Sequence, residues 1–311
     1  MDPLSDILSL LKPRTYLTAG FDAGGDWAVR FDDQAGQIKC YAVMSGGCRL
    51  AIEGFKESFA LTAGECFVLP TGRSFTLASD LALAARPALE IFALPRRAGV
   101  VVHNGGGGVF LAGCRFEVDG RHAARLLRSL PPVLHLHAES EQTALRWSIQ
   151  RMQAELRDQR PGGTLMAQHL AHMMLVQALR LSLDELVSGG VGWFFALADP
   201  QLSAAIGAMH ESPAYRWTLG DLAAQAGLSR SVFARRFREQ VGETPIAYLT
   251  RWRMTLAAEQ LTTGRRPLAQ TAFSLGYASE TAFNTAFKRV MGCSPRRYAR
   301  SEPSLLAGGS S

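Results

Sequence analysis

The feature that most constrains this chain is a pattern that occurs twice in its last hundred residues. Eight positions recur in residue type at a constant offset of 50. The first copy holds Ser229, Phe233, Phe237, Arg238, Gly242, Thr244, Pro245 and Tyr248, and the second holds Ser279, Phe283, Phe287, Lys288, Gly292, Ser294, Pro295 and Tyr298. A constant offset over eight positions predicts one supersecondary unit built twice.

Each copy is typical of two helices joined by a turn. In the first copy, Thr218 and Asp221 have the spacing of a capping box, and Ser229 is placed to cap a second helix. Phe233 and Phe237 lie four positions apart, so they share the buried face of that second helix. The first copy is therefore predicted to be a helix-turn-helix.

The second copy predicts the same arrangement, with a helix over 267–275 and another capped by Ser279. Between the copies, Thr244-Pro245 predicts the start of a helix that runs to about Leu261. About 17 residues at 1.5 Å each give a rod of roughly 25 Å. Such a rod is long enough to hold two recognition helices in successive major grooves on one face of DNA.

This repeated segment is basic, whereas the rest of the chain is not. Residues 200–300 hold 14 Lys and Arg against 6 Asp and Glu, and residues 1–199 hold 19 against 20. Positive charge confined to one part of a chain indicates a polyanionic partner, here double-stranded DNA. The alternative is a pair of helical hairpins with no ligand. That alternative explains the phenylalanine pairs but not the outward cluster of Arg230, Arg235, Arg236 and Arg238.

The same segment resembles the AraC/XylS family of transcription regulators in Gly276-Tyr277, Phe283, Phe287-Lys288-Arg289, Gly292, Ser294-Pro295 and Tyr298. The resemblance covers about residues 203–300 and implies two helix-turn-helix units. By position, it implies DNA contacts from Ser231, Ala234, Arg235, Glu280, Thr281, Asn284 and Thr285. We expect further DNA contacts from the outward cations Arg230, Arg238 and Lys288. Because Ser231 and Ala234 are small, Arg235 is the main candidate for a bidentate guanine contact. Glu280 either accepts a hydrogen bond from cytosine or only favours the helix dipole.

The first part of the chain predicts strands. Short apolar runs at 27–31, 38–44, 48–52, 66–69 and 75–77 are separated by Gly, Pro and Asp turns, a spacing typical of a small antiparallel barrel or jelly roll. Residues 64–75 resemble the second motif of cupin barrels. The expected fold class is α+β, with an N-terminal cupin-like antiparallel β-barrel, a helical hairpin and a C-terminal all-α double helix-turn-helix domain.

The expected boundaries are 1–118 for the cupin-like sensor domain, 119–190 for the helical hairpin and linker, 199–301 for the DNA-binding domain and 302–311 for a flexible tail. Apolar spacing predicts the two hairpin helices from Leu145 to Leu156 and from Leu165 to Leu183. The hairpin either packs on the barrel or pairs with a second subunit, and we expect a homodimer. We also expect RNA polymerase as a further partner.

An alternative function is a cupin-type metalloenzyme with an appended helical domain. Cupin enzymes hold their metal with histidines, but the second-motif position is Phe75, and residues 38–52 contain no histidine. Because a catalytic metal needs about three imidazole or carboxylate ligands, we expect no catalytic residue, no metal and no cofactor. The barrel is therefore interpreted as a sensor.

Two hypotheses remain for the signal. A subgroup of cupin-bearing relatives, which this chain resembles, senses reactive chlorine or electrophiles through cysteine oxidation, and here Cys48 and Cys66 are the candidate pair. Buried free cysteine is the structural alternative. The competing hypothesis is a small organic effector in the barrel. Its possible walls are Trp27, Tyr41, Phe67 and Phe75.

The remaining features predict a cytoplasmic protein with no membrane partner. Residues 1–6 lack the basic and apolar regions of a signal peptide. The most apolar stretch, residues 77–94, is interrupted by charged residues and proline. The five cysteines are odd in number and form no C-x-x-C pair, as is typical of reduced thiols.

Overall fold

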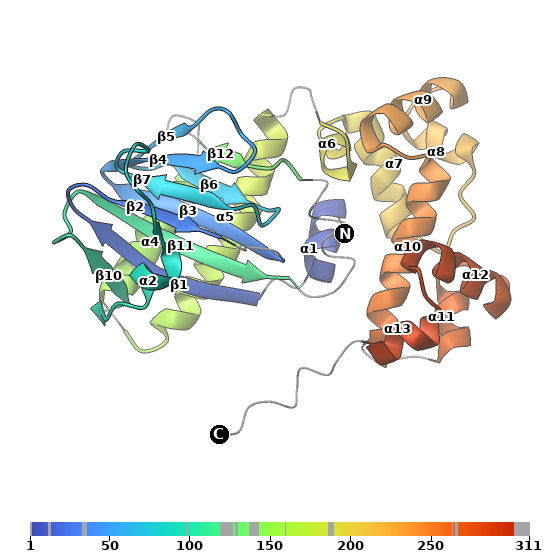
Figure 1. The fold of residues 1–311 in the computed structure, drawn as a ribbon. Coiled ribbons are helices and arrows are strands. Elements are labelled where there is room, and N and C mark those ends of the chain that lie inside the picture. Colours follow the sequence, from blue (N-terminus) through green and yellow to red (C-terminus); the bar gives the residue numbers. More distant parts are fainter. Residues whose placement is uncertain are drawn as a thin grey trace. The chain divides into compact units, whose positions relative to one another are not determined.

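The computed structural model describes residues 2–11, 14–32, 36–97, 99–118, 127, 130–136, 143–158, 160–185, 190–262, 264 and 267–301. The chain divides into two compact units (Figure 1). The sheet unit holds strands β1–β12 with helices α2, α4 and α5, and the helical unit holds α1 and α6–α13. The predicted tail at 302–311 and part of the predicted linker, 186–189, lie outside the described residues.

The sheet unit is built from two sheets that pack face to face. The larger sheet has the spatial order β12 (Leu134–Leu136), β6 (Cys66–Leu69), β3 (Gln37–Ser45), β11 (Val109–Glu117), β1 (Arg14–Ala23), β10 (Val100–His103) and β9 (Arg96–Arg97). The smaller sheet has the order β5 (Phe59–Thr62), β4 (Gly47–Ile52), β7 (Phe75–Ala78), β2 (Ala28–Phe31) and β8 (Arg86–Pro87). The described strands therefore form a two-sheet sandwich. A closed barrel is not found among them, and of the two expected architectures the jelly roll is the one built from two sheets.

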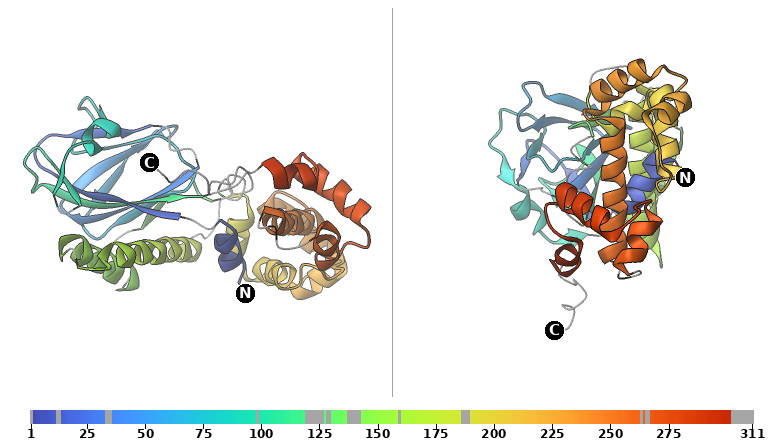
Figure 2. Two further views of the ribbon diagram at one scale, coloured as in Figure 1. Left: turned by 90° about the horizontal axis from the view of Figure 1, so that it is seen from below. Right: turned by 90° about the vertical axis from the view of Figure 1, so that its right-hand side faces the viewer.

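Alternation along the strands produces two separate cores. Residues two apart on a strand point to the same face, so Phe67 and Leu69 of β6 join the core between the sheets, together with Leu50 of β4. The intervening Cys66 and Val68 are equally buried but face the other way. That outer face of the larger sheet is covered by α4 (Thr143–Asp158) and α5 (Gly163–Glu185), seen in green below the strands in the left view of Figure 2.

The helices α4 and α5 occupy the positions where apolar spacing predicted a hairpin. The break between them contains Gly162, whose φ of 81° a residue with a side chain adopts only at a cost. The short helix α2 (Ala88–Phe92) packs beside β2 and β8. Within the described part of the chain, no helix combines the length and apolar character that crossing a membrane requires.

The helical unit is organised around one long helix. Its elements are α1 (Pro3–Leu11), α6 (Trp193–Leu197), α7 (Pro200–Glu211), α8 (Leu219–Gln225), α9 (Arg230–Val241), α10 (Pro245–Thr262), α11 (Leu268–Ser274), α12 (Glu280–Met291) and α13 (Pro295–Ser301). The α8–α9 pair and the α11–α12 pair both pack on α10 (Figure 1). The helix α1 precedes the first strand in sequence but packs on α7, within the helical unit.

Candidate nucleic-acid interface and apolar cavity

Local sequence fixes the boundaries of both helix pairs. The Thr218 hydroxyl accepts a hydrogen bond from the Asp221 backbone N–H at 3.2 Å, and the Asp221 carboxylate accepts one from the Thr218 N–H at 2.9 Å, which completes the predicted capping box. Ser229 caps α9 and Ser279 caps α12 through their hydroxyls. Both helices end at a glycine in the left-handed region, Gly242 with a φ of 84° and Gly292 with a φ of 79°.

The phenylalanines of the repeat form the same packing arrangement twice. In the first copy, the Phe237 ring centroid lies 5.5 Å from that of Phe233 and 5.8 Å from that of Tyr248. In the second copy, the corresponding distances from Phe287 are 5.7 Å to Phe283 and 5.5 Å to Tyr298. All six rings are buried. The 50-residue offset in the sequence therefore corresponds to two copies of one aromatic core.

Most of the candidate DNA contacts lie on the outer surface of α9 and α12. Seven side chains are exposed: Arg230, Ser231, Arg235, Arg238, Thr281, Thr285 and Lys288. Ala234, Glu280 and Asn284 are partly exposed. Asn284 differs from the others because its Oδ1 atom is buried and has no hydrogen-bond partner among the described residues.

Arg236 does not belong to the outward cluster, contrary to our expectation. Its Nη1 donates to Gln201 Oε1 at 2.7 Å, and its Nη2 forms an ion pair with Asp199 Oδ2 at 2.5 Å. Arg236 follows the buried Phe233 by three positions, so it lies at the edge of the inner face of α9. Its charge is therefore used to hold α9 against the start of α7, where Asp199 is the N-cap.

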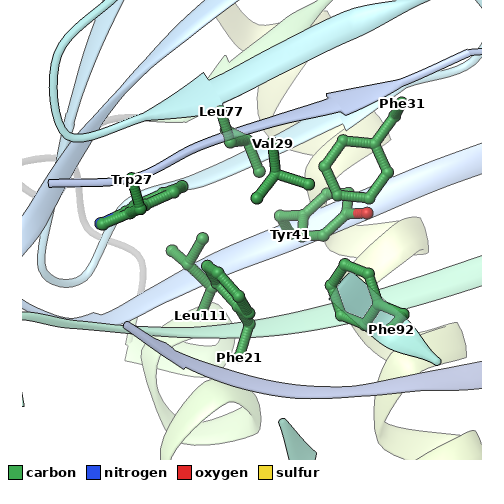
Figure 3. A pocket seen from close by; sticks show the side chains of 8 residues that line it. All are labelled: Phe21, Trp27, Val29, Phe31, Tyr41, Leu77, Phe92 and Leu111. Atoms are coloured by element: carbon green, nitrogen blue, oxygen red, sulfur yellow. The ribbon is translucent and has the colours of Figure 1, made fainter. Parts of the chain in front are cut away.

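A cavity lies between the two sheets and is lined by apolar and aromatic side chains. Figure 3 shows them converging from both sheets and from α2: Phe21, Trp27, Val29, Phe31, Tyr41, Leu77, Phe92 and Leu111. The free volume is about 10 Å³, roughly the least that a single water needs. Any larger occupant must displace one of these side chains.

Only two of the four residues that we expected to line the cavity do so. Trp27 and Tyr41 line the cavity, whereas Phe67 and Phe75 lie beside it in the inter-sheet core. Phe75, where a cupin enzyme has histidine, stacks on Phe31 with ring centroids 4.5 Å apart. In the described residues, no group of three or more His, Cys, Asp and Glu side chains is arranged to hold a metal ion. The expectations missed Phe21, because no strand was predicted before residue 27.

Cys48 and Cys66 are not neighbours in the way that the sensor hypothesis required. Cys48 belongs to the inter-sheet core, whereas Cys66 faces α4 and α5 from the other side of its sheet. The Sγ atom of Cys66 instead lies 3.6 Å from that of Cys40, and Cys114 is the cross-strand partner of Cys40. Burial raises the pKa of Cys48 to about 12, and the thiol contact with Cys66, with burial, raises the pKa of Cys40. Cys40 and Cys48 therefore stay protonated at neutral pH.

Comparison with known proteins matches both parts of the chain to families. Residues 2–184 match the family described as Cupin, and residues 222–301 match one described as Helix-turn-helix domain. A putative AraC-like transcription regulator of Streptomyces antibioticus is 43% identical over 96% of this chain and 99% of its own length. Another, of Streptomyces lividans, is 42% identical over 98% of this chain and all of its own. The RCS-specific HTH-type transcriptional activator RclR of Escherichia coli is 30% identical over 96% of this chain and 97% of its own.

Proposed function

This chain belongs to the family of AraC-like transcription regulators and is a DNA-binding regulator, and from that premise we propose how it reads DNA and what its sheet unit detects. In the proposal, α9 and α12 are two recognition helices that enter successive major grooves. The observation that carries it is the doubled aromatic core, because the same packing around Phe237 and Phe287 presents the outer faces of α9 and α12 in equivalent ways.

The charge of the proposed interface supports the same function. Arg235 and Arg238 on α9 and Lys288 on α12 are exposed cations on the two helices. Cations on a DNA-facing surface replace condensed counterions, so binding weakens steeply as the salt concentration rises. Arg235 is proposed as the bidentate contact to guanine, with the remaining outward residues of α9 and α12 as supporting base or phosphate contacts.

The proposal is tested by selecting duplexes from a random-sequence DNA library with the full-length protein. We expect a bipartite site whose two elements are separated by about one helical turn, 10–10.5 base pairs. Scrambling either element should weaken binding, and affinity should fall linearly on a logarithmic plot against salt. Recovery of a single short element, with no second element at a fixed distance, would contradict the two-helix arrangement.

For the signal, we propose that the cavity between the sheets binds a small uncharged apolar molecule. All eight lining residues are apolar or aromatic, so a buried carboxylate or ammonium would lose its hydration without gaining a charged partner there. Phe92 comes from the short helix α2 rather than from a strand, which makes it the side chain best placed to move aside.

The signal proposal is tested with two matched pairs of molecules: benzene against benzoate, and hexane against hexanoate. Trp27 lines the cavity, so its fluorescence should change with the neutral member of each pair only. Trp27→Phe is the control: it removes the fluorescence of Trp27 and leaves that of the other four tryptophans, so a change lost in this variant comes from the cavity. A response to benzoate or hexanoate that depends on Trp27 would overturn the apolar specificity.

The oxidant hypothesis has weaker support than the effector hypothesis. Cys48 lies in the core between the sheets and Cys66 in the core beneath α4 and α5, and all five cysteines are buried. Because the thiolate is the reactive form, burial slows the oxidation of these cysteines.

We further propose that the protein is cytoplasmic, acts as a homodimer and contacts RNA polymerase. We also propose that its cavity binds its ligand without catalysis, since no histidine or carboxylate lines it.

A further inference from the structure

Arg253 occupies a position in the helical unit that none of the functions above explains. It lies on α10, where its Nη2 atom donates to the backbone oxygen of Tyr215 at 2.7 Å and its Nε atom donates to that of Pro213. Both oxygens belong to the loop between α7 and α8. The guanidinium therefore ties the connecting helix to the loop that precedes the first helix pair.

The other side of the same guanidinium contacts the second helix pair. Its Cζ atom lies 5.8 Å from the ring centroid of Tyr277, in the turn between α11 and α12. Tyr277 packs in turn on Phe283, with ring centroids 5.6 Å apart, and Phe283 lies in the core of the recognition helix α12. Arg253 thus joins the first pair to the second through one side chain.

The backbone shows the same close approach between loop and turn. Gly276 precedes Tyr277 and has a φ of 81°, and a Cβ atom added to it would lie 2.2 Å from the backbone oxygen of Ala214. Only glycine allows the turn to reach the loop this closely. The loop is itself held in shape, because the Trp217 side chain donates to the backbone oxygen of Ser212 at 3.0 Å. The Gly276-Tyr277 motif is therefore half of a contact whose other half is the loop and Arg253.

We propose that Arg253 is a positioning residue that sets the distance and angle between α9 and α12, so that both meet DNA at one fixed spacing. This inference rests on the proposed reading of DNA by two helices. A rigid link lets the second helix bind without losing further freedom, so the two contacts reinforce each other. Its loss would loosen the spacing requirement rather than remove a DNA contact.

The experiment uses the full chain and the site selected from the random DNA library. Affinity is measured for that site, for the site with one base pair inserted between its elements, and for the site with one element scrambled. For the wild type, we expect the insertion to weaken binding at least tenfold. For Arg253→Ala, we expect binding to the intact site to be about tenfold weaker than for the wild type, and binding to the scrambled site to be unchanged. Within this variant, the insertion should weaken binding less than threefold relative to the intact site.

Arg251→Ala is the matched control, because it removes the same charge from the same helix. Arg251 pairs with Glu243 and lies over the Tyr248 ring, both next to the first pair only, so its insertion penalty should match the wild type. Arg253→Lys keeps the charge but not the forked donors, and it should behave like Arg253→Ala. The slope of affinity against salt should be unchanged in Arg253→Ala, because in this proposal the Arg253 guanidinium binds Pro213, Tyr215 and Tyr277 rather than a phosphate.

Three outcomes would overturn the proposal. An insertion penalty in Arg253→Ala equal to that of the wild type would show that Arg253 does not set the spacing. A salt slope lowered by about 1 would show a direct phosphate contact instead. An equal loss of affinity for all three DNAs, together with a lowered melting temperature, would show that Arg253 has a purely structural role. A wild type that tolerates the insertion would refute the two-helix function itself, which separates that failure from a failure of the Arg253 proposal.

Discussion

The imidazole of His210 lies between two groups that are far apart in sequence: its Nδ1 atom is 3.3 Å from the carboxylate of Asp6, and its Nε2 atom is 2.8 Å from the hydroxyl of Tyr248. The ring also stacks on Trp252, with centroids 3.8 Å apart. Burial, reinforced by the charge of Arg251, lowers the pKa of His210 to about 3. The neutral ring therefore donates from Nδ1 to Asp6 and accepts from Tyr248, and this joins α1 to α7 and α10.

This arrangement predicts that the helical unit is less stable in weak acid. Below pH 6.5, the unfolded chain binds a proton at His210 that the folded chain does not take up until about pH 3, so the free energy of unfolding falls as the pH falls across that window. The expected loss is about 1–2 kcal/mol between pH 6.5 and 5. Burial raises the pKa of Asp6, which gives a smaller opposite trend through its own titration range.

Urea unfolding at a series of pH values measures this effect. His210→Gln keeps a polar side chain but has no titration, so its dependence on pH between 6.5 and 5 should be flatter than that of the wild type. Parallel curves for the two proteins would show that the acid sensitivity comes from other groups.

Replacing the neighbours Arg235 and Arg236 by alanine should change different properties: DNA affinity for Arg235 and folding stability for Arg236. Arg235→Ala should weaken binding to the selected DNA by about 1–3 kcal/mol and relax specificity at one base pair, with an unchanged melting temperature. Arg236→Ala should leave Asp199 without its cation and lower the stability by about 1–3 kcal/mol. Paired measurements of melting and DNA affinity separate the two. Equal loss of affinity in both folded variants would contradict the assignment.

Leu111→Ala should enlarge the cavity between the sheets. Leu111 is buried, and leucine-to-alanine changes at such sites cost about 2–5 kcal/mol. Benzene should partly restore the stability, by about 1.4 kcal/mol at ten times its dissociation constant. The measurement is the melting temperature with and without benzene. A stabilisation of the variant by benzoate equal to that by benzene would argue against an apolar site.

Gly46→Ala should destabilise the sheet unit strongly, because a Cβ atom there would lie 2.0 Å from the backbone oxygen of Gly108 and the φ is 71°. Gly25 is the matched control, since its φ is 57° but no atom lies within 4 Å of an added Cβ. We expect Gly25→Ala to cost about 1–2 kcal/mol from backbone conformation alone, and Gly46→Ala to cost about 1–3 kcal/mol more from the clash. Equal costs in chemical unfolding would contradict the close contact.

The thiols should be almost unreactive in the folded protein. Burial raises the pKa of Cys48 and that of Cys114. The pKa of Cys40 is raised mainly by its thiol contact with Cys66. At pH 7, a colorimetric thiol reagent should therefore react slowly with native protein and should titrate five thiols in denaturant. Rapid modification of Cys40 or Cys66 in the native state, followed by altered DNA affinity, would revive the oxidant hypothesis.

The sequence by itself determined the parts of this protein whose interactions are local. The capping box of Thr218 and Asp221, the caps at Ser229 and Ser279 and the phenylalanine pairs all join residues three or four positions apart. Such contacts depend only on helical geometry, so spacing alone predicts them. The five short strands were also predictable from local sequence, because turn residues mark both ends of each apolar run.

Only the tertiary structure decided the contacts between distant segments. Whether Cys66 meets Cys40 or Cys48 depends on strand register and on which face of the sheet each thiol occupies. Arg236 points inward because Asp199 lies at the start of another helix. His210 contacts Asp6 of α1, a helix that we did not predict from the sequence. The two-sheet sandwich, in place of a closed barrel, likewise depends on pairings between strands far apart in sequence, which no local pattern encodes.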